Sequence, residues 1–456
     1  MAFPGPPAPV RGREHRRDVD RPSVTLAYVL APERRTRADV LTAAAIAVFV
    51  VVAVIVAWAT SGVANTESVV AGQPARPPQP AAKLPGKLQE MWRAPDTATT
   101  RALTSEGVAV TGANGSVVGH DPRTGEQVWR YTRELPLCGV ESQFGMVVAV
   151  YRTDRGCSET TMVSGADGQR RTARSSYMDD RVRLSVDGTY VVAQGPDRLE
   201  VWRSDLVRTL EYGYVDAKEN WKTQPRKGCE LLSAASSPSR LVVLERCPGE
   251  PANRISVLAP APKDDNVPEE YGSHLLEGAG AASADARVIA VSDNRIAVYQ
   301  PGTGGADPEA PRLTILDAKG NPIVVQELSA PLDETAGTLR TGSAFLVFTG
   351  NSVIALNAGT FDPMWTAADA LGTPVPMAGK ILLPIPGAIA ALDPATGAQV
   401  GRIPVARPDY GGGPISLGVL GNTVLEHRDG QLVALADPDT SDSPRSETGR
   451  PAKPLR

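Results

Sequence analysis

The chain has 456 residues, of which 43 are Gly, 40 are Pro and 42% are apolar, and its formal net charge is -4 at pH 7. This composition favours many short strands joined by Gly and Pro turns, and it disfavours a helical bundle. Residues 1–38 carry eight Arg against four acidic residues, a surplus of +4 that leaves -8 on the remainder. An acidic globular part argues against nucleic acid as a partner, because phosphate contacts need clustered Lys and Arg.

The N-terminal part divides into a basic tail and an apolar segment. Residues 1–38 are rich in Pro and Arg without an apolar period, which predicts a disordered cytoplasmic tail. Val40–Ala59 contains no charge. At a helical rise of ~1.5 Å per residue, a segment of this length covers the ~30 Å of a bilayer's hydrocarbon core. We therefore predict a single transmembrane helix over residues 39–60.

The distribution of basic residues predicts the orientation of this helix. Arg34, Arg35 and Arg37 directly precede it, and the next basic residue after it is Arg76. By the positive-inside rule the N-terminus is cytoplasmic and the rest of the chain lies outside the cell membrane. Ala57–Ala59 resembles a signal-peptidase site, but the long basic region and the full-length apolar stretch favour an uncleaved anchor.

Beyond the helix, composition divides the chain into three parts. Residues 61–86 form a Pro/Ala-rich linker, which we expect to be extended, to contribute no strand and to hold the next domain away from the bilayer. Residues 87–438 alternate short apolar runs with turn residues and form the predicted folded domain. Residues 439–456 are polar without a core pattern, which predicts a second disordered tail.

One stretch, Gly115–Trp129 (GSVVGHDPRTGEQVW), carries the pattern that this domain repeats. A short apolar run leads into Asp-Pro, then Thr-Gly, then Val-Trp, which is typical of a strand, a tight turn and a returning strand. The pattern returns at Ile389–Val400 and, more loosely, at Val353–Trp365 and Leu313–Val324. Recurrence at roughly the length of one blade predicts an all-β propeller.

Eight blades can be counted, although insertions at Ala261–Ser273 and Pro301–Pro311 keep a count of seven open. The predicted blades are Arg101–Thr132, Cys138–Ala173, Val182–Tyr212, Cys229–Glu277, Ala284–Leu328, Thr338–Trp365, Thr373–Val405 and Ile415–Asp437.

The eighth blade has no outer strand of its own, whereas Leu88–Arg93 is a strand pattern left over before the first blade. Trp92 in this segment stands where Trp129 and Trp365 stand in their blades. We predict that Leu88–Arg93 pairs with Gln431–Ala436 and closes the ring, because closure removes two open sheet edges.

All four cysteines fall in the second and fourth predicted blades. The pairs Cys138–Cys157 and Cys229–Cys247 have similar spacings, and each pair brackets one branched strand. We predict two disulfides that tie neighbouring strands within a blade, as an oxidising compartment allows. A metal site would favour CxxC-type spacing, which is absent, so we predict neither a metal ligand nor a catalytic cysteine.

The histidines offer little chemistry. His120 and His427 end strands in the first and eighth blades, so a shared site stays open, but a solvated or hydrogen-bonded loop His is the favoured interpretation. No HExxH, GxSxG, P-loop or SxxK motif occurs. We therefore predict no catalytic residue and no cofactor-binding residue.

The aromatic and acidic residues of the repeat also have a structural interpretation. Three aspartates at the same turn position are expected to form Asx-turns; they are Asp121, Asp317 and Asp393. Four tryptophans at strand positions either line a ligand funnel or, as we favour, pack between blades; they are Trp92, Trp129, Trp202 and Trp365.

The phrases VVGHDPRTGEQVW and IAALDPATGAQV resemble the PQQ-like propeller repeat, in which an apolar strand, LDxxTG and a strand ending in Trp follow one another. The resemblance covers roughly residues 88–437 and implies an eight-bladed ring. The chain is similar overall to membrane-anchored PQQ-like propellers of high-GC actinobacteria. It is more remotely similar to BamB, the propeller scaffold of outer-membrane protein assembly. Dehydrogenases of this fold have a vicinal Cys-Cys pair and acidic metal ligands. This chain has no adjacent cysteines, so the resemblance implies no quinone cofactor and no functional residues.

These observations predict a single-pass membrane protein that displays a propeller outside the cell membrane. Its expected role is binding, as a scaffold or sensor for an envelope protein or polymer, without a cofactor. The alternative is an enzyme, either a quinoprotein-type dehydrogenase or a propeller hydrolase. Clustered carboxylates at the central channel would favour the enzyme, and an exposed apolar or charged patch would favour binding.

Overall fold

The computed structural model describes residues 36–59, 65–215, 222–303, 309–334 and 337–439. The chain divides into two compact units, Met1–Ala64 and Asn65–Arg456. Within the described residues, the first unit contains one helix and the second contains the strands.

Helix α1 (Arg37–Ala59) is the described element of the first unit, and most of the predicted N-terminal tail lies outside the described residues. Thr36 caps the helix, because its Oγ1 accepts a hydrogen bond from Asp39 N (3.2 Å) while Thr36 N donates to Asp39 Oδ2 (2.8 Å). Arg37–Ala57 has a mean hydropathy of 3.1, and none of it is buried against protein. By length and composition, α1 is therefore a candidate membrane span.

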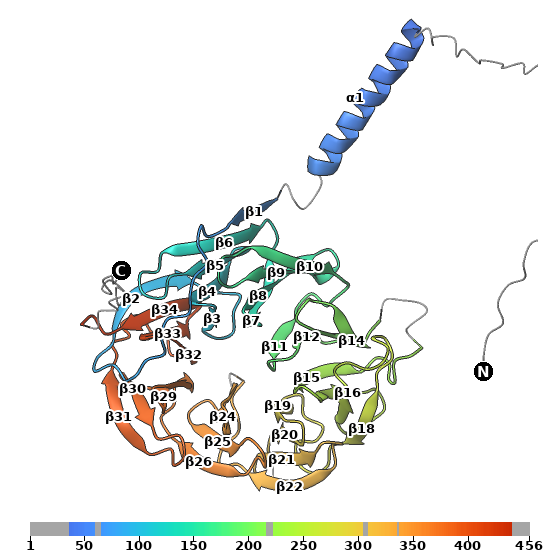
Figure 1. The fold of residues 1–456 in the computed structure, drawn as a ribbon. Coiled ribbons are helices and arrows are strands. Elements are labelled where there is room, and N and C mark those ends of the chain that lie inside the picture. Colours follow the sequence, from blue (N-terminus) through green and yellow to red (C-terminus); the bar gives the residue numbers. More distant parts are fainter. Residues whose placement is uncertain (1–35, 60–64, 216–221, 304–308, 335–336, 440–456) are drawn as a thin grey trace, which may run out of the picture. The chain divides into compact units, whose positions relative to one another are not determined.

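The second unit is a ring of eight β-sheets, here called blades 1 to 8 (Figure 1). Blade 1 contains β3 (Leu103–Ser105), β4 (Val108–Ala113), β5 (Ser116–His120) and β6 (Gln127–Arg133). Blade 2 contains β7 (Leu137–Gln143), β8 (Met146–Thr153), β9 (Gly156–Ser164) and β10 (Arg170–Ser175). Blade 3 contains β11 (Arg183–Val186), β12 (Val191–Gln194), β13 (Arg198–Trp202) and β14 (Arg208–Gly213). Blade 4 contains β15 (Glu230–Ser236), β16 (Leu241–Arg246), β17 (Arg254–Leu258) and β18 (Glu270–Leu275).

The second half of the ring follows the same order, with antiparallel strands running outward in chain order. Blade 5 contains β19 (Arg287–Val291), β20 (Arg295–Gln300), β21 (Arg312–Asp317) and β22 (Pro322–Glu327). Blade 6 contains β23 (Thr338–Arg340), β24 (Ala344–Phe348), β25 (Val353–Asn357) and β26 (Pro363–Ala367). Blade 7 contains β28 (Val375–Met377), β29 (Lys380–Ile385), β30 (Ala388–Leu392) and β31 (Gln399–Pro404). Blade 8 contains β32 (Ile415–Leu420), β33 (Thr423–Arg428) and β34 (Gln431–Ala436), with β27 (Gly372–Thr373) parallel to β32.

The prediction of an eight-bladed all-β propeller is confirmed. The insertion that blurred blade 4, Ala261–Ser273, leads into the outer strand β18 of that blade. After Pro301–Pro311, which is only partly described, β21 and β22 complete blade 5. The first insertion therefore lengthens the connection to the outer strand of blade 4, and the second lengthens the connection between β20 and β21 of blade 5, without adding or removing a blade.

An N-terminal strand completes blade 8. β2 (Gln89–Pro95) runs antiparallel to β34, with Trp92 opposite Ala434 and Pro95 opposite Gln431. The segment is the one that the sequence left without a partner in blade 1. Strands from the two ends of the domain thus share one sheet, so the ring has no open seam.

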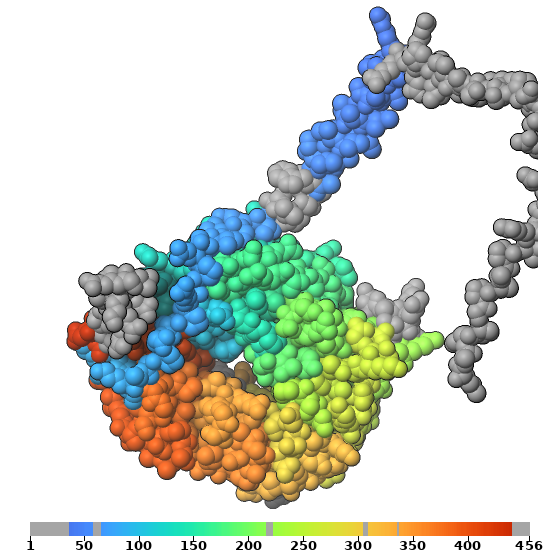
Figure 2. All heavy atoms as spheres, viewed as in Figure 1, coloured from blue at the N-terminus to red at the C-terminus, as the bar shows by residue number. Residues whose placement is uncertain are grey.

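The expectation that residues 61–86 contribute no strand is wrong. Thr66–Val69 forms β1, which adds a fifth strand to blade 1 by pairing with β6. In the segment that follows, Ala75 N donates to Ala166 O in the β9–β10 turn of blade 2 (2.8 Å), and the chain then passes over blades 1 and 8 (Figure 2). Further along, Leu84 packs on the apolar cluster of blades 7 and 8. Ladder bonds and backbone contacts hold this segment, and such contacts leave no apolar period in the sequence.

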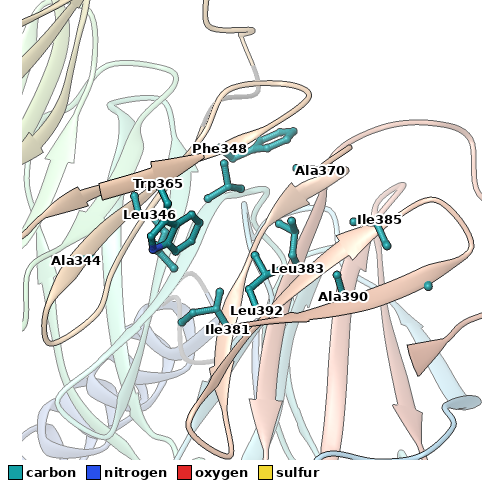
Figure 3. Close-up of a cluster of buried hydrophobic side chains, with 13 residues drawn as sticks. Ala344, Leu346, Phe348, Trp365, Ala370, Ile381, Leu383, Ile385, Ala390 and Leu392 are labelled. Carbon is teal, nitrogen blue, oxygen red and sulfur yellow. The ribbon is translucent and has the colours of Figure 1, made fainter. Parts of the chain in front are cut away.

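The hydrophobic core is divided among the interfaces between blades. Figure 3 shows one such cluster, in which Leu346 and Trp365 of blade 6 face Ile381, Leu383 and Leu392 of blade 7. Middle strands read as continuous apolar runs because both of their faces are covered by neighbouring blades. The side chains that are free to bind a partner therefore lie on the outer strands, the connecting turns and the inner rim.

Candidate functional site

The Asp-Thr-Gly turn of the repeat has a structural role in this chain. Asp121 Oδ1 accepts hydrogen bonds from Arg123 N and Thr124 N, both at 2.9 Å. Asp393 and Asp317 make the same kind of turn with the backbone that follows them. These are the expected Asx-turns, so the carboxylates are engaged locally.

Tryptophans of the repeat dock on the next blade. Trp92 packs over Gly125 and donates from Nε1 to Pro122 O (3.0 Å), while Trp365 donates to Pro394 O at the same distance. Trp129 likewise donates to Gly165 O (2.7 Å). These indoles join one blade to the turn of its neighbour. Trp202, which is as fully buried as Trp129, instead donates from Nε1 to Glu200 Oε2 of its own blade (2.8 Å).

Both predicted cysteine pairs lie at disulfide distance. The Sγ–Sγ distance is 2.02 Å for Cys138–Cys157 and 2.06 Å for Cys229–Cys247. The second pair joins the neighbouring strands β15 and β16 at their ends, as expected. The first departs from the expectation, because it links β7 to β9, which are separated by β8.

Each of the two blade-end histidines has partners of its own. His120 lies against Trp92 (ring centroids 5.3 Å apart) and is within hydrogen-bond distance of Thr111 Oγ1 (3.0 Å). Burial lowers the pKa of His120 below its ordinary value, which favours the neutral ring. His427 instead contacts Asp96 O (3.1 Å). No contact in the described chain joins the two histidines into one site.

The chemistry-bearing cavity that the sequence did not predict lies between the outer strands of blades 2 and 3. It has a volume of about 480 Å³ and is lined by residues of β10, β13, β14, the β8–β9 turn, the chain next to β10 and β14, and the blade 4 insertion. We call it the arginine pocket. Its charged lining residues are Arg155, Arg174, Arg198, Arg208, Glu211 and Asp265.

Carboxylates hold most of these guanidinium groups in place. Glu200, which is fully buried, accepts from Arg198 Nη2 (2.7 Å) and lies 3.0 Å from Arg174 Nη2. Burial opposes ionisation of Glu200, but the two arginines lower the pKa of this carboxyl below its ordinary value. Asp265, which belongs to the blade 4 insertion, lies 2.8 Å from Arg208 Nη2 and pairs with it. The pocket is thus a fixed ionic frame.

The outer edge of blade 5 is a second candidate surface. Ile323, Val324 and Val325 of β22 are 50%, 42% and 49% exposed, and β22 carries no charge before Glu327. Three other edges are covered or charged. β1 covers β6, the segment at Asp265 bonds β14, and β10 is rich in arginine. An exposed apolar edge strand is a template for pairing with another strand.

Comparison with known families places the fold. The model described as the outer membrane protein assembly factor BamB, of the PQQ-like type, matches residues 189–425, more than half of the chain. The chain belongs to this family. No curated protein matches the sequence of this BamB-type chain.

Solved structures with a similar fold include BamB from Moraxella catarrhalis, at 15% identity and a TM-score of 0.48, over 76% of this chain and 99% of that chain. They also include a quinohemoprotein alcohol dehydrogenase from Pseudomonas putida HK5, at 11% identity and a TM-score of 0.48, over 83% of this chain and 81% of that chain.

Among the described residues of this BamB-type chain, the cysteines and the one group with metal-ligand spacing have structural partners. Its cysteines are joined in pairs at separations of 19 and 18 residues, so none forms a vicinal pair. One described group, Cys229, Glu245 and Cys247, has the spacing of metal ligands, but both of its thiols belong to a disulfide. Glu245 itself accepts from Tyr212 Oη and Arg226 Nε. The group is therefore part of a structural network.

Proposed function

We propose that this chain is a membrane-anchored binding scaffold of the cell envelope, with its propeller outside the cell membrane and an extended segment of another envelope protein paired to β22. The orientation is supported by the Arg residues before α1 and by the two disulfides, which form in oxidising compartments.

The exposed edge of β22 is the observation that carries this proposal. Three adjacent branched apolar side chains at an unpaired edge favour aggregation unless a partner covers them. The chain itself uses strand addition elsewhere, because β1 extends blade 1 and pairs Glu67 with Arg130 (2.6 Å) at the added strand. Addition of a strand to an exposed edge is a common mode of peptide recognition.

The charges around β22 define the partner segment. Lys319 lies in the turn before the strand, and Glu327 ends it, with only apolar and uncharged residues between them. An antiparallel partner that fits this edge is apolar at its centre, carries an acidic residue opposite Lys319 and carries a basic residue opposite Glu327.

Site-specific photo-crosslinking in intact cells tests the proposal. A benzophenone amino acid at Val324 should give one discrete adduct, whose partner peptide maps to an extended apolar segment of an envelope protein. The matched control is Val400, which is 55% exposed on the outer strand β31 of blade 7. Val325→Lys should abolish the adduct at Val324.

Equal labelling at the two positions would mean that β22 has no specific partner. An adduct of twice the chain mass would identify a second copy as the occupant and would contradict the scaffold role. The enzyme alternative gains no support from the arginine pocket, because the pocket lies between outer strands and carboxylates already pair with Arg174, Arg198 and Arg208.

A further inference from the structure

We propose that the arginine pocket binds a phosphorylated polyol, with the phosphate held by arginines and a hydroxyl of the ligand donating to Glu211. The pocket lies at the rim between blades 2 and 3, on strands other than β22. This inference is therefore independent of the proposed scaffold function.

Unsatisfied donors in the pocket point to an anion. The Nε atoms of Arg174 and Arg198 are buried and have no hydrogen-bond partner, and the side chain of Arg198 is only 4% exposed. Arg155 lines the same pocket, is exposed, and has no ion-pair partner among the described residues. The Nε atoms of Arg130, Arg287 and Arg312 outside the pocket are in the same state, so the free guanidinium of Arg155 is the donor that leaves this pocket open to an anion.

The charges of the pocket do not balance within the protein. Four guanidinium groups line it, against the carboxylates of Glu211 and Asp265 in the lining and of Glu200 behind it. Burial, together with the nearby charges of Arg208 and Arg198, lowers the pKa of Arg174 despite the attraction of Glu200. A bound anion would relieve this repulsion.

The shape and the donor set narrow the ligand class. Guanidinium forks match the oxygen geometry of phosphate, which accepts several N–H bonds at once. Glu211 Oε1 is buried without a donor, so the pocket also offers an acceptor for a hydroxyl group. A volume of about 480 Å³ suits a small phosphorylated molecule or the headgroup of a phospholipid.

Calorimetric titration of the full chain in a neutral detergent tests this inference, with glycerol 3-phosphate and dihexanoyl phosphatidylglycerol as probes. Arg155→Gln removes a free guanidinium that no internal contact needs, so the variant should fold as the wild type does. Arg171→Gln is the matched control, because Arg171 is likewise exposed and lies on β10, which contributes Arg174 to the pocket, but Arg171 does not line the pocket.

Saturable binding at one site is expected for the wild type and for Arg171→Gln, with at least about tenfold weaker binding for Arg155→Gln. Binding of glycerol 3-phosphate alone would identify a soluble ligand, and comparable binding of phosphatidylglycerol would identify a lipid headgroup. The absence of saturable binding by both probes, equal weakening in the two variants, or equal binding of unphosphorylated glycerol would each overturn the inference.

Discussion

Replacing Gly397 with Ala should destabilise the propeller through a contact between blades. Gly397 ends the turn between β30 and β31 at a φ of 69°, and a Cβ added there would lie 2.6 Å from Trp365 Cδ2. The ring atoms of Trp365 cannot withdraw easily, since its Nε1 donates to Pro394 O and its other face packs in the core between blades 6 and 7.

The expected magnitude combines two terms. Placing Ala in the left-handed region costs about 1–2 kcal/mol, and forcing an extra carbon into a packed site costs about 1–3 kcal/mol. We therefore expect a loss of about 2–5 kcal/mol in the free energy of unfolding. Gly387 is the matched control in the same blade, because its φ is 68° and its added Cβ would meet nothing within 4 Å. Gly387→Ala should lose only the cost of the left-handed conformation, about 1–2 kcal/mol.

Urea unfolding of the full chain in neutral detergent, monitored by far-UV circular dichroism, measures both losses. The dependence of the unfolding free energy on urea concentration should be the same for each variant. A Trp365→Ala background should reduce the effect of Gly397→Ala to that of Gly387→Ala, because the clashing ring is gone. If Gly397→Ala and Gly387→Ala shift the midpoint equally in the wild-type background, the indole does not constrain the turn and the docking argument fails.

Three further predictions concern the N-terminal strands, the disulfides and the topology. A chain that begins at Asn65 should stay folded, and one that begins at Lys87 should unfold at a lower urea midpoint because it lacks β1. A chain that begins at Asp96 should aggregate in size-exclusion chromatography, because blade 8 is then open. Identical behaviour of all three chains would refute strand closure. Non-reducing peptide mapping should recover the two cysteine pairs, and Cys157→Ser should cost about 2–5 kcal/mol, whereas free thiols in protein from its native compartment would contradict the pairing. Protease added to intact spheroplasts should degrade the propeller and spare an N-terminal tag, and a protected propeller would reverse the proposed orientation.

The blade pattern was predictable because its determinants are local. Asp121, Thr124 and Gly125 make their turn within a few residues, and the Trp that docks on such a turn stands at a fixed place in the preceding blade. Sequence spacing alone did not identify which strands the first disulfide joins, because Cys138 and Cys157 bracket β8 whether they tie neighbours or bridge across it. Thr66–Val69 gave no signal, because four residues paired by backbone bonds need no apolar alternation.

The arginine pocket could not have been predicted from the sequence. Its arginines come from β10, β13 and β14 and from the β8–β9 turn, and Asp265 reaches it from the next blade. In the sequence these arginines are scattered among many others and form no motif. Their significance depends on a folded arrangement that buries Glu200 and Glu211 beneath them and leaves several donors without partners.

Both candidate surfaces lie at the outer edges of blades, and these edges differ in how they are covered. Closure by β2 completes blade 8, and β1 shields β6, so the two N-terminal strands already cover two edges. At β14 the covering segment is the blade 4 insertion, where Glu211 N donates to Asp265 O (2.8 Å), and this cover also forms one wall of the arginine pocket. β22 has neither a covering segment nor a charge along its exposed apolar run. Three other edges are covered or charged, whereas β22 presents three consecutive exposed branched side chains, and that contrast is the physical basis of the proposed scaffold role.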